Sequence, residues 1–283
     1  MGETMRKNFA QILKSGKVDY QKEYKKLYEL LFERHIGDDD DEFCSIHMVF
    51  GESFTSFHFR GTCISLQEFD EVNGFSFSNP AEKEPTFEDL ILIMEYFYNM
   101  IFWYQASFPP YLENSIDTGF LIQHIIKVAD AIGYEQKTEN GLTIFVEKNA
   151  VATAVAESDL IPDDLSYKLI TYDHHSMCGD LEKKKSIIVR LASILEGKQA
   201  KLNQVSPTLK KDLFYIFNNF NIRHNNCDNQ SKDYKPAIAA MDKKELEKWY
   251  DETYQMCLLA LMEIEQADRK PMLDEIKAKI ESK

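Results

Sequence analysis

The stretch DLFYIFNNFNIRHNNCD, residues 212–228, decides how the C-terminal half of the chain is organised. Residues 213–220 carry apolar side chains three and four positions apart, which is the spacing of an amphipathic helix. This pattern ends in RHNN, residues 223–226, a cluster so rich in hydrogen-bonding groups that a folded domain must pair or use them. The stretch therefore predicts a packed helix that runs into a polar loop.

Neighbouring segments of the C-terminal half repeat the helical spacing. Residues 180–196 and 243–266 carry apolar positions at intervals of three and four. A further helix is expected to begin near Pro207, because proline is favoured in a first helical turn. Pro271 lacks the N–H that a helix interior needs, so we expect a separate last helix to follow it. Together these segments predict a helical bundle.

The N-terminal half mixes strand and helix patterns. Apolar and polar side chains alternate between residues 43 and 66, around Gly51-Glu52-Ser53, which predicts a hairpin with a third strand. Residues 134–147 predict a second hairpin, because two strand-like segments flank Asn140-Gly141, a preferred tight turn. Helices are expected over residues 19–35, after Thr86, and over residues 117–132.

The patterns together predict an α+β protein that is mainly α. We expect three regions: residues 1–115 as an α+β region, residues 116–177 as a helix plus hairpin that connects, and residues 178–283 as the bundle. A chain of 283 residues with 44% hydrophobic side chains can build such cores. Glu95 and Asn99 lie one turn apart in the long apolar helix and must find hydrogen-bond partners there.

Charge and cysteine content limit the partners. The formal net charge of −14 argues against a whole molecule built to bind nucleic acid or an anionic membrane. Residues 180–235, however, hold eleven Lys and Arg against six Asp and Glu, which indicates either a side facing a polyanion or solvated helix faces. No apolar segment is long enough to span a membrane, and no DNA-specific motif occurs. Five scattered cysteines and a charged N-terminus predict a cytoplasmic protein.

Two polar loops contain the candidate site. Residues 173–178, DHHSMC, and residues 221–228 each contain a His-x-x-Cys, and both lie at one end of the bundle if the intervening helices return antiparallel. Arg223 can grip a phosphate with paired hydrogen bonds, and His224 can transfer a proton near neutral pH. Attack by a ribose 2′-hydroxyl needs no metal, so no cofactor is predicted. Substrate contacts are expected from Asn225, Asn226, His174, His175, Lys184 and Lys211.

The order of helix, helix, Arg223-His224-Asn225-Asn226 and a long aromatic-containing helix resembles the HEPN-type helical domains of bacterial abortive-infection and toxin proteins. The resemblance covers the chain from about Leu165 onward. It implies a helical bundle that commonly dimerises, here through the C-terminal helices, and a metal-independent ribonuclease site built from Arg and His. In that family the two catalytic residues are separated by several positions, whereas Arg223 and His224 are adjacent.

Two other interpretations of the same loops stay open. His175, Cys178, His224 and Cys227 have the side-chain types of a structural zinc site. Alternatively, the RHNN cluster caps helix ends and locks the long loop that follows, because Asn and Asp bond readily to nearby backbone. The protein would then be a non-catalytic interaction module that dimerises. The expected functions are therefore RNA binding or cleavage, and, as the alternative, a structural or interaction role.

Overall fold

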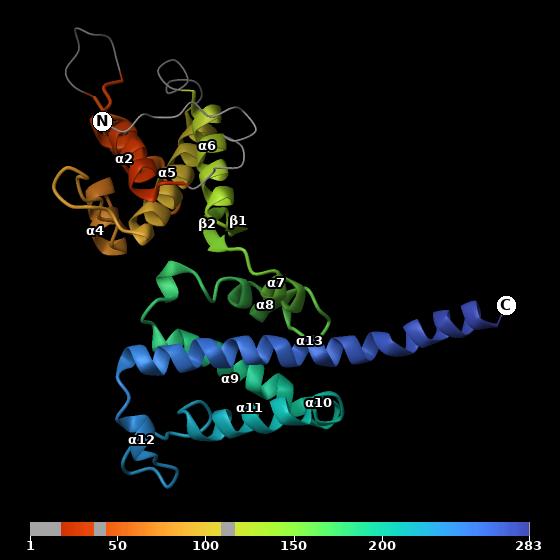
Figure 1. Ribbon diagram of the computed structural model, residues 1–283. Helices are drawn as coiled ribbons and strands as arrows, with labels where there is room; N and C mark the ends of the chain where they lie inside the picture. Colours follow the sequence, from red (N-terminus) through yellow and green to blue (C-terminus); the bar gives the residue numbers. More distant parts are fainter. Residues whose placement is uncertain (1–17, 37–43, 109–116, 283) are drawn as a thin grey trace, which may run out of the picture. The chain divides into compact units, whose positions relative to one another are not determined.

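The computed structural model describes residues 18–36, 44–108 and 117–282 (Figure 1). The chain divides into two compact units, Met1–Lys148 and Asn149–Lys283, and each unit has its own hydrophobic core. This division differs from the three predicted regions, because the predicted connecting region, residues 116–177, is shared between the two units.

The N-terminal unit is built around α5 (Phe87–Ser107), which is buried along most of its length. The predicted capping box is confirmed: the Thr86 hydroxyl accepts from Asp89 N–H, and the Asp89 carboxylate accepts from Thr86 N–H. α2 (Tyr20–Tyr28), which continues into a π-helical turn, η1 (Glu29–Glu33), packs on α5. α6 (Thr118–Ala131) also contacts α5 and leads into the hairpin.

The hairpin predicted between residues 43 and 66 is wrong. This segment forms α3 (Ile46–Ser53), a 3₁₀ turn η2 (Phe54–Ser56) and the start of α4 (Leu66–Asn73). Serine hydroxyls just before α3 and α4 accept from backbone N–H groups three residues later, as helix caps do. Short apolar runs fit both the strand and the helix period, and here the caps favour the helix.

The second predicted hairpin is confirmed as β1 (Tyr134–Glu139) paired antiparallel with β2 (Leu142–Glu147). Asn140 and Gly141 form its turn with φ values of 52° and 84°, and positive φ explains the choice of these two residue types. Asn99 of α5 accepts from Thr143 N–H and donates to its carbonyl, both at 2.7 Å, and Glu95 accepts from Phe145 N–H at 2.7 Å. Polar side chains of α5 therefore satisfy the open edge of β2.

The C-terminal unit is helical. In chain order it contains α7 (Ala150–Ala156), α8 (Asp163–Ile170), a 3₁₀ turn η4 (His175–Met177), α9 (Leu181–Gly197), α10 (Gln199–Val205), α11 (Pro207–Asn219), α12 (Pro236–Ala239) and α13 (Lys243–Glu281). α13 packs on α7, α9, α10 and α11 through one buried face. At its centre the rings of Tyr172 and Tyr254 stack at 3.9 Å, and the Tyr254 hydroxyl donates to the Leu169 carbonyl.

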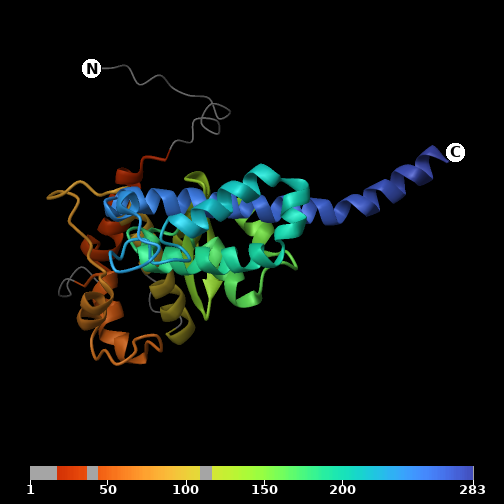
Figure 2. The same ribbon diagram turned by 90° about the horizontal axis from the view of Figure 1, so that it is seen from below.

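The expected break of the last helix at Pro271 is wrong, because α13 runs through the proline to Glu281. Its buried residues end at Ile264, and every described residue from Asp268 onward is exposed. The last turns continue past α7 and α10 in Figure 1 and stand clear of α10 and α11 in the turned view of Figure 2.

The structure confirms an α+β fold that is mainly α, because its described residues contain one two-stranded sheet among many helices. Among these residues, no helix combines the length and the apolar character that crossing a bilayer requires.

Candidate functional site: the loops at residues 173–178 and 221–228

Asn226 holds the loop that follows α11. Its side chain is fully buried; the carbonyl oxygen accepts from Asn221 N–H at 2.8 Å, and the amide group donates to the carbonyls of Asn218 at 3.2 Å and Asp233 at 2.7 Å. Asn221 has a φ of 56°, a left-handed conformation that asparagine tolerates. The side chain of Asn226 therefore supplies hydrogen-bond partners to backbone groups of the loop, as the capping interpretation predicts.

The Arg223 side chain contacts residues of its own unit. The guanidinium forms an ion pair with Glu196, donates to the Ala192 carbonyl at 3.2 Å, and lies 5.0 Å from the Phe217 ring and 5.4 Å from the Phe214 ring. Its side chain is only 17% exposed, and burial lowers its pKa despite the neighbouring carboxylate. These contacts link the loop to the C-terminal turns of α9, which is a packing role.

The two residues that follow Arg223 face solvent. The Nδ1 atom of His224 lies 3.4 Å from the Asp233 carboxylate, and its side chain is 43% exposed. Asn225 donates to Asp228 at 3.2 Å on the surface. The predicted acid–base residue is thus accessible, but Arg223, the expected phosphate ligand beside it, is held elsewhere.

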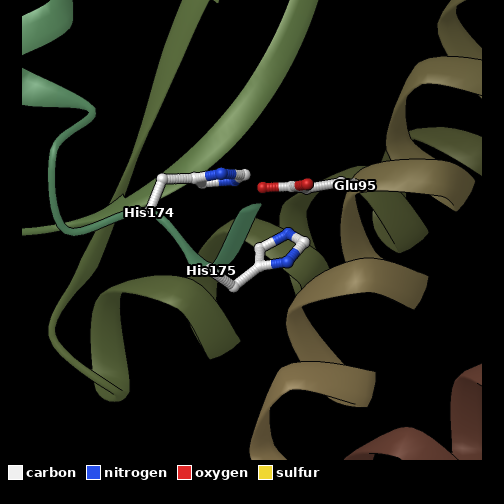
Figure 3. A group of neighbouring side chains, drawn as sticks. All are labelled: Glu95, His174 and His175. Carbon is white, nitrogen blue, oxygen red and sulfur yellow. The ribbon is translucent and has the colours of Figure 1, made fainter. Parts of the chain in front are cut away.

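In the first loop, His174 and His175 lie together just before α9. Their rings are 4.1 Å apart and tilted by 46°, and Figure 3 shows both side chains. His174 is buried, and its Nδ1 atom lies 2.8 Å from the Ser176 hydroxyl and also accepts from Ser176 N–H. This arrangement caps the η4 turn, so a local structural role accounts for His174.

The two lysines expected to contact a substrate lie in different settings. The ammonium of Lys184 is buried and lies 2.8 Å from both Glu247 and Asp251 of α13. It is also 5.4 Å from the Tyr172 ring. Lys211 is exposed on α11. Lys184 therefore fastens α9 to α13 and is not presented to a ligand, whereas Lys211 is.

Both loops contact the same part of α13. This agrees with the prediction that they lie at one end of the bundle. Gly179 N–H donates to Glu247 at 2.7 Å, and one turn later the Tyr250 hydroxyl lies 3.5 Å from the Asn221 carbonyl. A shallow cavity at the first loop is lined by residues 176, 178–182 and 243, with no residue of the second loop.

The residues proposed for zinc are not gathered into a ligand set. Within residues 18–36, 44–108 and 117–282, no three of His175, Cys178, His224 and Cys227 hold their donor atoms within 4.8 Å of one another. Burial also raises the pKa of the Cys227 thiol, which opposes the thiolate that zinc requires. The geometry favours the capping interpretation over the metal site.

The sequence reasoning missed an apolar stripe on the exposed end of α13. Leu273 is 45% exposed, Ile276 is 48% exposed and Ile280 is 69% exposed, and Leu259 continues the same helical face at 51%. Their spacing of three and four, with a multiple of seven between Leu259 and Leu273, was visible in the sequence. The stripe becomes continuous only because α13 runs through Pro271, which the sequence predicts to separate two helices.

No protein-family model, curated protein or solved structure matches the chain. The function is therefore inferred from the contacts and exposed surfaces described above.

Proposed function

We propose that the chain is a non-catalytic interaction protein that forms a homodimer through the C-terminal part of α13, and that residues 221–228 are a structural lock. The observation that carries this proposal is the exposure of a heptad-spaced apolar stripe on a helix end with no packing inside its own unit. The internal bonds of Arg223 and Asn226 support the structural part.

The stripe has the geometry of a coiled-coil seam. Leu259, Leu273, Ile276 and Ile280 all fall at the two seam positions of one heptad register. Met262 also falls at a seam position, but it is partly buried against the core of its own unit. Gln266 and Arg269 occupy the same positions between Leu259 and Leu273 and are exposed. Pro271 falls on the opposite side of the helix, so its missing hydrogen bond lies away from the seam.

The end of α13 needs a partner to be stable as a helix. An internal proline costs a helix about 3 kcal/mol, and helices in proteins draw most of their stability from packing. Residues 268–282 contain Pro271 and bury no side chain within their unit. Packing of the apolar stripe against a second helix would supply the missing stabilisation.

Four charges beside the stripe fit a second copy in antiparallel orientation. Glu263 and Glu265 flank the seam near its start, and Lys277 and Lys279 occupy the equivalent flanking positions two heptads later. An antiparallel pair centred near Pro271 places each glutamate opposite a lysine of the other copy. Interhelical charge pairs of this kind set partner and orientation in coiled coils.

The experiment is to measure the mass of the full chain in solution by light scattering across a range of concentrations. We expect a dimer for the wild-type protein and a monomer for Leu273→Glu/Ile276→Glu. Ile64→Glu/Val72→Glu is a matched control, because it introduces the same two charges at exposed apolar positions of the N-terminal unit. A wild-type monomer at about 100 μM, or a dimer that survives the double substitution, would reject the proposal.

Single-stranded RNA is the second candidate partner, and a shallow groove along α11 favours it. Lys210, Lys211 and Asn218 line this groove of about 660 Å³. Tyr215 adds an aromatic ring that is 63% exposed. Basic groups beside an exposed ring are the elements with which proteins bind unpaired bases and their phosphates. Phe214 lines the same groove and contacts the Arg223 guanidinium.

Fluorescence anisotropy with a labelled single-stranded RNA 12-mer at low salt tests the second candidate. Lys211→Glu and Tyr215→Ala should each weaken binding about tenfold. Lys244→Glu makes the same change of charge on the exposed start of α13 and should have a small effect. If all three variants bind like the wild-type protein, or if no binding is detected, the groove is not an RNA site.

A further inference from the structure

A cavity of about 250 Å³ lies within the N-terminal unit, where α4, α5 and β2 meet. Its lining is mostly apolar, and five aromatic rings contribute to it: Phe57, Phe59, Phe69, Phe75 and Tyr96. An apolar cavity of about 150 Å³ is large enough to hold benzene. The cavity of this unit therefore has room for one aromatic ring with a short substituent.

The five rings form one continuous wall. Phe59 contacts Phe57 at 5.7 Å, Phe57 contacts Phe69 at 5.4 Å, and Phe69 contacts Phe75 at 5.7 Å between ring centroids. Phe75 then meets Tyr96 edge to face at 5.2 Å. Each ring packs on its neighbours, so the wall is formed before any ligand arrives.

Both ends of this wall are fixed to other parts of the unit. The Tyr96 hydroxyl donates to the Asp70 carboxylate at 3.2 Å. At the other end, the Phe59 ring lies so close to Gly141 that a Cβ atom there would approach it to 3.1 Å. The wall is thus anchored both to α4 and to the turn between β1 and β2.

The polar side chains that α5 and β2 contribute to the lining are bonded within the unit. Asn99 donates to the carbonyls of Glu95 and Thr143 and accepts from Thr143 N–H, each at 2.7 Å. The Glu95 Oε1 atom accepts from Phe145 N–H at 2.7 Å. The Thr143 hydroxyl lies 2.8 Å from the hydroxyl of Thr138. A ligand in the cavity therefore meets polar groups that already have partners.

A cavity of this kind favours a neutral, apolar ligand. A buried hydroxyl loses its bonds to water unless the protein supplies a new partner, and a buried charge loses still more. An apolar molecule leaves water without that loss, and its transfer is favourable. An aromatic ring also packs edge to face or offset on the rings of the wall.

We propose that this cavity binds a neutral alkylbenzene-type compound, a single aromatic ring with a short apolar substituent, packed on the wall from Phe59 to Tyr96. The site lies wholly within the N-terminal unit. It depends neither on self-association through α13 nor on the groove along α11. No chemical step is assigned to it.

Isothermal titration calorimetry on the full chain at pH 7 tests this with three probes of nearly one shape: ethylbenzene, benzyl alcohol and benzylamine. Their substituents end in a methyl, a hydroxyl and an ammonium group. Ethylbenzene should bind at least about tenfold more tightly than benzyl alcohol, and benzylamine should bind least. A smaller difference between ethylbenzene and benzyl alcohol, tighter binding of benzylamine, or no binding from a saturated solution of ethylbenzene would each overturn the proposal.

Two substitutions that fill the cavity test its location. Leu142 and Ile144 lie on one face of β2 and both line the cavity. Leu142 is 37% exposed, so the larger side chain of Leu142→Trp can enter the space from the rim. Ile144→Phe fills it through a smaller change. Each variant that folds should weaken ethylbenzene binding at least about tenfold.

Val72→Trp is the matched control, because it places the same bulky ring at a 71% exposed position of α4 outside the cavity lining. It should bind ethylbenzene like the wild-type protein. Unchanged affinity in Leu142→Trp and Ile144→Phe, or an equal loss in Val72→Trp, would show that the ligand binds elsewhere and would overturn the proposal.

Discussion

Asn226 is the residue on which the loop after α11 depends. It is fully buried, and it serves one backbone donor and two backbone acceptors. Asn225, next to it, is exposed and donates to a surface carboxylate, that of Asp228. The two adjacent asparagines therefore have different roles. The sequence alone does not show which of them is buried.

Asn226→Ala should destabilise the protein by about 3 kcal/mol, because it leaves several buried backbone groups without partners. Asn225→Ala should change the free energy of unfolding by less than about 0.5 kcal/mol, as is usual for surface positions. Urea denaturation of both variants measures the difference. Equal losses of unfolding free energy in the two variants would show that Asn226 does not hold the loop after α11.

The ion pairs of Lys184 with Glu247 and Asp251 should make the stability of the protein depend on pH. Burial opposes its charge, but hydrogen bonds with Asp251 and Glu247 outweigh burial and raise its pKa above the ordinary 10.5. Burial likewise opposes the charge of Glu247, but hydrogen bonds from Lys184 and Gly179 N–H outweigh it and lower the pKa below the ordinary 4.5. The stabilisation from Glu247 is therefore present above pH 4.5 and lost as the pH falls through the lowered value.

Lys184→Met should cost about 2 kcal/mol at pH 7, because it leaves Glu247 partly buried without its cation. The difference from wild type should shrink below pH 4.5 as Glu247 is protonated. Lys183→Met is the control, since Lys183 is 66% exposed. Denaturation at pH 7 and pH 3 gives the result; a cost that is equal at both values would contradict the assignment.

Among the elements, α13 differs most from expectation. The spacing predicts a helix over residues 243–266 and a separate helix after Pro271, because proline is disfavoured inside helices. In the structure the two are one continuous helix. In α3 the error was similar: an alternating pattern suggested strands, and serine caps with core packing produced a helix. By contrast, the Asn140-Gly141 turn and the Thr86 capping box have specific local chemistry and were predicted correctly.

Pro271→Ala should strengthen the end of α13. The substitution restores a backbone hydrogen bond on the face opposite the apolar stripe and removes a penalty of about 3 kcal/mol. We expect slower hydrogen exchange over residues 272–282 and tighter self-association. Dissociation of the dimer by this substitution would place residue 271 in the interface and contradict the proposed seam.

The candidate site could be predicted only in part. The sequence identified the two polar loops, and both do contact one region of α13. It did not reveal that Arg223 turns toward Glu196 and Ala192, because those partners lie about thirty residues earlier and become neighbours only when α9 and α11 pack.

For the whole molecule, two units with separate cores are joined in one chain, and only the C-terminal unit carries the proposed dimer helix. The charges along this helix allow its orientation to be tested without changing any apolar residue. Glu263→Lys/Glu265→Lys leaves only lysine at the four flanking positions, whereas Lys277→Glu/Lys279→Glu leaves only glutamate. Each variant should repel itself in an antiparallel pair.

The most direct measurement is sedimentation equilibrium of these two variants, separately and mixed in equal amounts. Self-association through an antiparallel α13 predicts that each variant alone is monomeric or associates at least about tenfold more weakly than wild type. The mixture should form a heterodimer, because lysines and glutamates then face one another at the four exchanged positions. If both variants dimerise as well as the wild-type chain, or if the mixture remains monomeric, the antiparallel α13 dimer is contradicted.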